Sequence, residues 1–272
     1  YTNILTSEVN RKELLAAVKA IQPLTDSREI QIYRSAIEIY STGNYIELRA
    51  SDGESEALVR IRRSGNHRLS TLVSAKTLSK SIEAFSDKKI QIGFQKDTSE
   101  LILRKTDETR KLGLKAIDNT KLPQPIKLGD QTMLTEVSAS EYSNALLKAI
   151  RIAGAKGSRP VLETVALSSL SFLGKNHLNV LSTDGHRLIE IPVETEEKIF
   201  LNKPFLWPIG SIKAAALEMA RASKEDPMLK VKVVEYNGGA ELLFKERSWK
   251  TVGTNGTYPD TKKLFKAARG EN

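Results

Sequence analysis

The residue types best suited to chemistry in this sequence gather in one stretch, residues 178–193. Asp184 and His186 lie two positions apart there, and together with a serine hydroxyl they would have the components of a hydrolytic site. Two residues on one tight turn are too constrained for an ordinary base and its orienting carboxylate, and no nucleophile elbow accompanies them. The sequence therefore disfavours an enzyme, and we expect no catalytic residues.

Metal and cofactor chemistry find equally little support. The chain has no Cys, which excludes disulfides and thiolate metal sites and fits a reducing compartment. The three His residues, at positions 67, 177 and 186, lack metal-ligand spacing. There is no Gly-rich phosphate loop, no aromatic RNA platform, and no apolar run long enough to span a membrane. We expect no metal, no cofactor and no membrane partner.

The same stretch has one feature of a binding surface. Asp184-Gly185 lies between two apolar-rich runs and predicts a hairpin, with positive φ expected at both turn positions. Alternation along the return strand places Leu188 on the face that carries His186 and Glu190. The opposite, core-facing set is Ile189, Ile191 and Val193. Leu188 is thus an apolar side chain on an otherwise polar face.

The basic residues are spread over the whole chain. The formal net charge is +9; residues 1–127 hold 22 Lys and Arg against 16 Asp and Glu, and residues 128–272 hold 20 against 17. Many lie on the polar faces of expected helices or in the loops that follow them, and several recur at equivalent positions of a repeat. Solvated helix faces would explain single residues, whereas the recurrence favours a phosphate-facing surface that is independent of base sequence. The residues expected to face DNA are Lys12, Lys19, Arg28, Lys76, Lys80, Lys148, Arg151, Lys156, Arg159 and Lys213, with Arg221 as a further candidate.

The order of expected elements indicates an α+β architecture of duplicated domains. Each half reads as strand, helix and three strands, followed by the same unit again. Helices are expected near residues 11–24, 75–85, 139–153 and 209–222, and two of the less regular strands near 30–39 and 199–207. Expected boundaries are a first domain at 1–122, a linker at 123–131 with two prolines, a second domain at 132–260 and a tail at 261–272.

The duplication can be followed residue by residue. A shift of 132 positions places Leu14 on Leu146 and Asp52-Gly53 on Asp184-Gly185 without a gap. The same shift replaces His186, Arg187 and Leu188 by Glu54, Ser55 and Glu56. The first hairpin therefore has a polar outer face, so maintenance of the fold does not itself demand an apolar residue at position 188.

The chain resembles a known family, the bacterial beta sliding clamp, which is the processivity subunit of the replicative DNA polymerase. Residues 183–188, Thr-Asp-Gly-His-Arg-Leu, resemble the signature hairpin of that family almost letter for letter. Residues 158–162 resemble the strand entry of its second domain, and residues 256–260 the turn that leads out of it. Trp207-Pro208 is similar to the Val-Pro-like dipeptide that precedes the last helix of that domain. The resemblance covers the first and second clamp domains.

The resemblance implies a non-catalytic ring around duplex DNA, with helices lining the hole and sheets outside. It implies a cytoplasmic, nucleoid-associated protein, with polymerase, clamp loader and repair proteins as partners that insert short peptides into a pocket beside the hairpin. Carried over by motif, the pocket residues are Leu162, Thr183, Gly185, His186, Arg187, Leu188, Pro259, Lys263 and Leu264. Lys263 stands where the family pattern has Arg, which would lose bidentate geometry.

The family's third domain is missing from this sequence, and two readings remain open. A natural two-domain clamp would close as a trimer, because family rings contain six domains; a chain that lacks a third domain would belong to a dimeric ring. A truncated clamp fragment that forms no ring, and a non-ring DNA-binding module, are the alternatives. Nothing in the sequence resembles a helix-turn-helix or a homeodomain, which disfavours recognition of particular base sequences.

Overall fold

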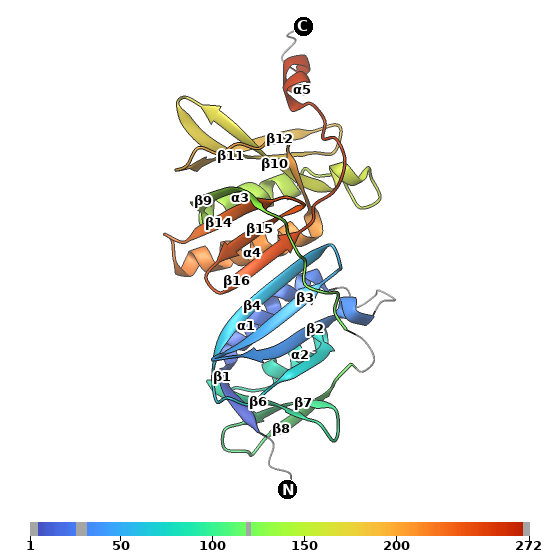
Figure 1. Ribbon diagram of the computed structural model, residues 1–272, viewed down its shortest axis with the longest axis vertical. Helices are drawn as coiled ribbons and strands as arrows, with labels where there is room; N and C mark the ends of the chain where they lie inside the picture. The colour runs from blue at the N-terminus through green and yellow to red at the C-terminus, as the bar shows by residue number, and fades with distance from the viewer. Residues whose placement is uncertain (1–4, 26–31, 118–120, 269–272) are drawn as a thin grey trace. The chain divides into compact units, whose positions relative to one another are not determined.

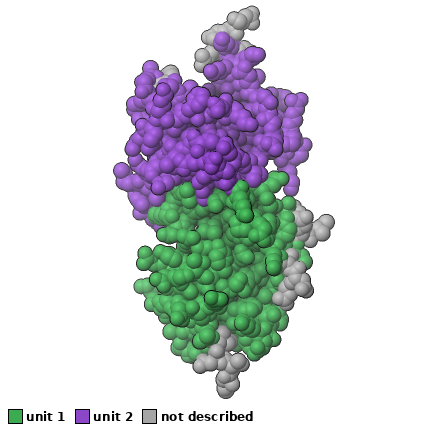
Figure 2. Space-filling view, viewed as in Figure 1, with its two compact units in different colours: residues 1–127, 243–250 green, residues 128–242, 251–272 purple. Residues whose placement is uncertain are grey.

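The computed structural model of the protein describes residues 5–25, 32–117 and 121–268. By its internal contacts the chain divides into two compact units, coloured separately in Figure 2: unit 1 comprises residues 1–127 and 243–250, and unit 2 comprises residues 128–242 and 251–272. The predicted boundaries of the domains, linker and tail stay predictions. No helix in the described ranges is long and apolar enough to cross a membrane.

Unit 1 contains an antiparallel sheet with two helices on one of its faces (Figure 1). The helices α1 (Arg11–Ile21) and α2 (Ala75–Glu83) contact each other as well as the strands. The strands are paired in the order β8-β7-β6-β1-β4-β3-β2-β5. Their bounds are β1 (Thr6–Asn10), β2 (Ala36–Thr42), β3 (Tyr45–Ser51), β4 (Ser55–Ser64), β5 (Ser70–Ser74), β6 (Lys89–Gln95), β7 (Glu100–Lys105) and β8 (Lys111–Lys115).

Unit 2 repeats this order of elements. Its helices α3 (Ala139–Ile150) and α4 (Ile209–Glu225) pack together against the four-stranded sheet β12-β11-β10-β13. A second set of strands runs β9-β14-β15-β16, of which residues 243–250, in β15 and β16, are assigned to unit 1 by their contacts. The strand bounds are β9 (Gln131–Ser138), β10 (Thr164–Phe172), β11 (Lys175–Thr183), β12 (Leu188–Thr195), β13 (Phe205–Pro208), β14 (Lys230–Tyr236), β15 (Gly239–Phe244) and β16 (Arg247–Thr251). The predicted α+β class and the repeat of strand, helix and three strands are confirmed.

The helices begin where polar side chains cap them and bury one apolar stripe. Asn10 Oδ1 accepts the backbone N–H groups of Lys12 and Glu13 at the start of α1. Ser74 and Ser138 cap α2 and α3 in the same way through their hydroxyl oxygens. Such a cap stabilises a helix by about 1 kcal/mol. The predicted α1 stripe of Leu14, Val18 and Ile21 is fully buried, so both helices of a unit turn their polar faces away from the sheet.

Three expectations about local structure were wrong. The helix predicted to reach residue 24 ends at Ile21 and continues as the short 3-10 helix η1 (Gln22–Leu24), which contains Pro23. The strand predicted from residue 30 begins only at Ala36, because the preceding η2 (Ile32–Ser35) is a 3-10 turn; residues 30 and 31 lie outside the described ranges.

The third error concerns the strand predicted over residues 199–207, where only β13 from Phe205 is extended and paired. Ile199 and Leu201 are buried although they belong to a loop, and the backbone N–H of Leu201 donates to the Ser169 hydroxyl at 3.1 Å. Their apolar character reflects burial rather than a strand. The expected tail also contains a helix that sequence reading missed, α5 (Thr261–Ala268), which Asp260 caps through the N–H groups of Lys262 and Lys263.

Candidate functional site

The turn between β11 and β12 is built by side chains that bind its own backbone. Asp184 Oδ1 accepts the N–H groups of His186 at 2.9 Å and Arg187 at 2.7 Å. The Thr183 hydroxyl accepts the N–H of Gly185 at 3.0 Å and donates to the Arg187 carbonyl at 2.6 Å. Thr183 and Leu188 are the last paired residues, so residues 184–187 form a four-residue loop. Side chains at positions 183 and 184 thus fix the loop.

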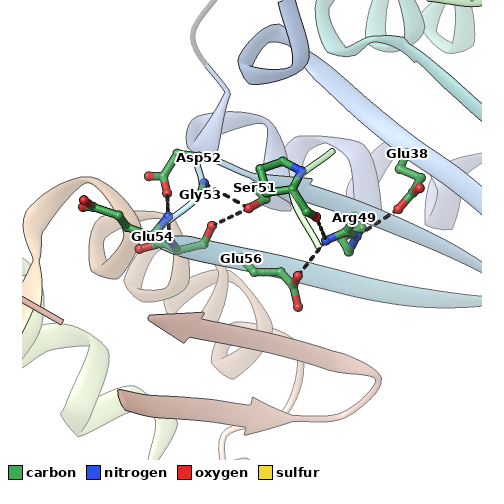
Figure 3. Close-up of polar contacts among 9 residues, drawn as sticks. Glu38, Arg49, Ser51, Asp52, Gly53, Glu54 and Glu56 are labelled. Carbon is green, nitrogen blue, oxygen red and sulfur yellow. Dashed lines mark hydrogen bonds and ion pairs between the residues drawn. The ribbon is translucent and has the colours of Figure 1, made fainter. Parts of the chain in front are cut away.

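The corresponding turn of unit 1 has the same bonds (Figure 3). Asp52 Oδ1 accepts the N–H groups of Glu54 at 2.9 Å and Ser55 at 2.7 Å. The Ser51 hydroxyl accepts the N–H of Gly53 and donates to the Ser55 carbonyl, both at 3.1 Å. The predicted repeat therefore extends to individual hydrogen bonds, and the turn belongs to the fold.

The expectation of positive φ at both turn positions was wrong. Positive φ occurs at Gly185, at 93°, and at Gly53, at 96°, whereas neither aspartate has it. A two-residue hairpin would need both residues in that region, but here the aspartate caps a longer loop instead. His186 consequently lies in the loop and not on a strand face, because β12 begins at Leu188.

The electrostatics of this turn do not suit acid–base catalysis. Hydrogen bonds from the backbone N–H groups of Arg187 and His186, together with the Arg187 side chain, hold the pKa of the Asp184 carboxyl well below its usual range. Arg187 Nε and Nη2 lie 2.9 and 2.8 Å from Asp184 Oδ2. The carboxylate is thus occupied by its own turn and by Arg187, and it is not positioned against the His186 ring.

An apolar surface lies beside the turn on the outer face of the sheet, opposite the helices. Ala166 is paired with Leu181 on one side and Leu206 on the other, so these three residues share a face. Tyr258 and Val161 pack on them. Leu188 lies on this face because it is opposite Thr183, two positions from Leu181, and it is half-buried. Ala166, Leu181, Leu206 and Tyr258 are buried, and Val161 and Leu188 are partly exposed at the edge of the cluster; we use the name apolar groove for these six residues together.

Two of the predicted pocket residues border the groove through further contacts. A Cβ placed on Gly185 would lie 4.0 Å from Leu162 Cδ1, so Leu162 lies beside the turn. Burial raises the pKa of Tyr258 to about 12, and the backbone of Thr183 beside its hydroxyl opposes the shift. Pro259 follows Tyr258 and is half-buried, whereas Lys263 and Leu264 are exposed on α5.

Sequence reasoning missed most of the groove. Val161, Ala166, Leu181, Leu206 and Tyr258 were not predicted as site residues. A signal existed for Leu181, because Val180 and Leu181 are adjacent apolar residues of one strand and must lie on opposite faces. The shift of 132 also aligns Leu181 with Arg49, a change from a charged to an apolar residue.

The same place in unit 1 is filled by ion pairs (Figure 3). Arg49 Nε lies 2.9 Å from Glu38 Oε2, and Arg49 Nη1 lies 2.8 Å from Glu56 Oε2. Nη1 also donates to the Pro123 carbonyl at 2.9 Å. Although burial opposes its charge, the hydrogen bonds to Glu38 and Glu56 raise the pKa of Arg49. We call Glu38, Arg49 and Glu56 the ionic triad.

Strand register makes the two sets equivalent. Glu38 is paired with Arg49 as Ala166 is with Leu181, and Ser51 is paired with Glu56 as Thr183 is with Leu188. The triad positions of unit 1 therefore hold Ala166, Leu181 and Leu188 in unit 2. In unit 1 these positions hold charged side chains that pair with one another, whereas in unit 2 Ala166 and Leu181 are buried and Leu188 is a partly exposed apolar side chain that a partner can cover.

The predicted DNA-facing residues lie mainly on the exposed faces of the helix pairs. Lys12 and Lys19 on α1, Lys76 and Lys80 on α2, Lys148 on α3 and Lys213 on α4 are all exposed. Lys19 Nζ forms an ion pair with Glu83 at 2.8 Å. Arg151, Lys156 and Arg159 are exposed at the end of α3 and in the loop after it, and Arg28 lies outside the described residues.

Arg221 differs from this set because its charge is neutralised within α4. Its guanidinium lies 2.7 Å from Glu218 and 2.8 Å from Glu225. It is therefore a weak candidate for phosphate contacts. Within the described ranges, no three His, Asp or Glu side chains gather as metal ligands.

Comparisons with known proteins agree with this geometry. Residues 5–123 match the family model of the DNA polymerase III beta subunit, N-terminal domain. Comparison with curated protein sequences found no match. The sliding clamps of Caulobacter crescentus and Bacillus subtilis superpose with a TM-score of 0.82, at 17% and 16% identity, over 96% of this chain and 68% of each of theirs.

Two further structures carry ligands. The Pseudomonas aeruginosa sliding clamp bound to griselimycin has a TM-score of 0.80 at 16% identity, again over 96% of this chain and 68% of its own. A Caulobacter crescentus clamp with the same TM-score and 17% identity, over the same shares of both chains, holds polyethylene glycol at a region proposed to tether beta-motifs. Residues 5–123 thus match the N-terminal domain of the DNA polymerase III beta subunit, and the chain as a whole has the fold of the solved bacterial sliding clamps.

Proposed function

We propose that this protein is a sliding clamp that encircles duplex DNA as a homo-oligomeric ring and tethers the replicative polymerase for processive synthesis. The fold and the family match support the general function. Cations on the helix pairs of both units support a DNA-facing layer, since among the described residues Lys12, Lys76, Lys80, Lys148 and Lys213 form no ion pair. Such contacts are independent of sequence and are weakened by salt. The protein acts in the cytoplasm, at the nucleoid.

Partner peptides bind in the apolar groove beside the Thr183–Leu188 turn, with polymerase, clamp loader and repair proteins as the partners. The observation that carries this assignment is the replacement of the ionic triad by Ala166, Leu181 and Leu188 at the same three places. Burial of one Leu or Phe anchor there would contribute about 1.5–3 kcal/mol. Leu162, Gly185, Pro259, Lys263 and Leu264 would form its rim, as would the exposed His186 and Arg187.

Ring formation can be tested by topology. A duplex whose ends are both blocked by bulky proteins should retain the clamp at moderate salt, whereas the same duplex with one free end should lose it. Solution mass by light scattering should equal three subunits for a ring of two-domain subunits. Equal retention on open and blocked duplexes, or a monomeric mass, would contradict a ring formed by this chain.

The helix faces are tested on the same blocked duplex. Lys148→Glu with Arg151→Glu should reduce retention as salt is raised, because two phosphate contacts become repulsive. Lys198→Glu with Lys232→Glu is the matched control, since both residues are exposed cations outside the helices. Equal loss in both double variants would show that net charge alone, and not the helix faces, holds the DNA.

A further inference from the structure

A groove of about 510 Å³ lies on the outer face of the unit 1 sheet. Its volume falls within the roughly 300–1,000 Å³ of typical ligand sites. The lining residues come from β2, β3, the entry to β5 and the segment that follows β8. The ones that carry charge or a titratable hydroxyl are Glu38, Tyr40, Arg49, Arg68 and Lys121.

The charged side chains on the floor of the groove are held by one another, with one guanidinium between two carboxylates. Arg49 is held by Glu38, Glu56 and the Pro123 carbonyl (Figure 3). Burial and the neighbouring Glu47 raise the pKa of the Tyr40 hydroxyl, which keeps it a neutral donor. Glu47 in turn forms an ion pair with Arg60 at 2.6 Å. A ligand would meet a preformed polar surface, which lowers the entropic cost of binding.

The excess charge of the groove is positive. Arg68 and Lys121 are exposed, and among the described residues neither forms an ion pair. Arg68 precedes β5, and Lys121 lies in the segment after β8, next to the buried Leu122 that anchors this segment to Ala36 and Leu72. Among the described residues of the lining, Glu38 is the one carboxylate, and it is engaged by Arg49. Two cations therefore remain for a ligand.

We propose that this groove binds an acidic peptide segment of a partner protein. Carboxylates of the peptide pair with Arg68 and Lys121 while its backbone and polar groups meet Tyr40, Ser70 and Gln124. The groove lies on the sheet face opposite α1 and α2, and thus opposite the cations assigned to DNA. The two units then select partners of opposite chemistry: apolar anchors at the groove of unit 2, and carboxylates at the groove of unit 1.

The test measures fluorescence anisotropy of a labelled peptide of alternating Glu and Gly, at moderate salt, with the full chain. Arg68→Glu with Lys121→Glu should weaken binding at least about tenfold, because two attractive pairs become repulsive. The control is Lys88→Glu with Lys96→Glu, which changes the net charge equally at two exposed cations of unit 1 outside the groove. This control should bind as the parent does. The Gln and Gly version of the peptide should not bind.

Four outcomes would overturn the proposal. Equal loss in the two double variants would show unspecific attraction to a basic protein. Binding of the Gln and Gly peptide would show that carboxylates are not recognised. Stronger binding of a single-stranded oligonucleotide, with the same dependence on Arg68 and Lys121, would assign the groove to nucleic acid. Leu188→Glu, in the other unit, should leave the acidic peptide unaffected, and loss of its binding in that variant would also contradict the assignment.

Discussion

Arg49→Leu should destabilise the protein far more than an ordinary surface change. The Arg49 side chain is 6% exposed and that of Glu56 is 5% exposed, so the substitution leaves a buried carboxylate without its counter-charge. Breaking a buried pair in this way costs about 3–5 kcal/mol. The Pro123 carbonyl also loses its donor. We expect a decrease in the free energy of unfolding of about 4 kcal/mol.

Replacing all three triad residues with their unit 2 equivalents should restore most of the stability that Arg49→Leu loses. The triple variant Glu38→Ala, Arg49→Leu and Glu56→Leu places the residues of the apolar groove at the equivalent positions, so no unpaired charge remains. Replacing a buried ion-pair network by apolar residues is often neutral or stabilising. The Pro123 carbonyl still lacks its donor, which leaves a cost of about 1–3 kcal/mol.

Urea unfolding followed by circular dichroism measures both variants. Arg62→Leu is the control, because Arg62 is an exposed residue of β4 on the same sheet; its effect should stay within about 0.5 kcal/mol. A loss of less than about 1 kcal/mol in Arg49→Leu would refute the reasoning. A triple variant as unstable as Arg49→Leu would refute it as well, because the penalty would then not arise from unpaired carboxylates.

Three further predictions concern the turn and the apolar groove. Leu188→Glu should weaken binding of polymerase-derived peptides about tenfold or more, measured by anisotropy, while the circular dichroism spectrum stays unchanged; unaltered affinity would contradict the assignment. Gly53→Ala and Gly185→Ala should each cost about 1–3 kcal/mol in urea unfolding, because their φ values of 96° and 93° strain a side chain equally; clearly unequal costs would show that the turns are not equivalent. The raised pKa of Tyr258, about 12, predicts stability that is complete below pH 10 and lost as the pH rises toward 12; Tyr258→Phe should make this loss shallower in urea midpoints measured across that range, and an unchanged slope would exclude Tyr258 as a contributor.

The periodic parts of the fold could be predicted from the sequence. Leu14, Val18 and Ile21 show helical spacing and are buried as expected, and the shift of 132 located the equivalent turns. Prediction from local sequence failed where residues are apolar because they are buried, although their segment is neither a helix nor a strand. Ile199 and Leu201 are apolar because a loop is buried, and α5 lies in residues 261–272, which were expected only as a tail.

The turn and the apolar groove could be predicted only in part. The sequence indicated Leu188 as a binding residue because it is an apolar side chain on a strand face that is otherwise polar. It did not indicate that Leu181, Leu206 and Tyr258 share that face, since they come from strands and a segment far apart in the chain. Cross-strand register, which sets those neighbours, depends on pairing that a single strand does not encode. The ionic triad was missed for the same reason.

The turn at Thr183 and Asp184 has a consequence for how such proteins can be altered. Its backbone depends on a hydroxyl, a carboxylate and one glycine, and the Arg187 side chain adds an ion pair to that carboxylate. Position 187 is not freely exchangeable, because its equivalent in the first copy, Ser55, is buried. Position 186 is exposed in both copies, as His186 and as Glu54, so the side chain shown to a partner can be changed there without altering the bonds that close the turn.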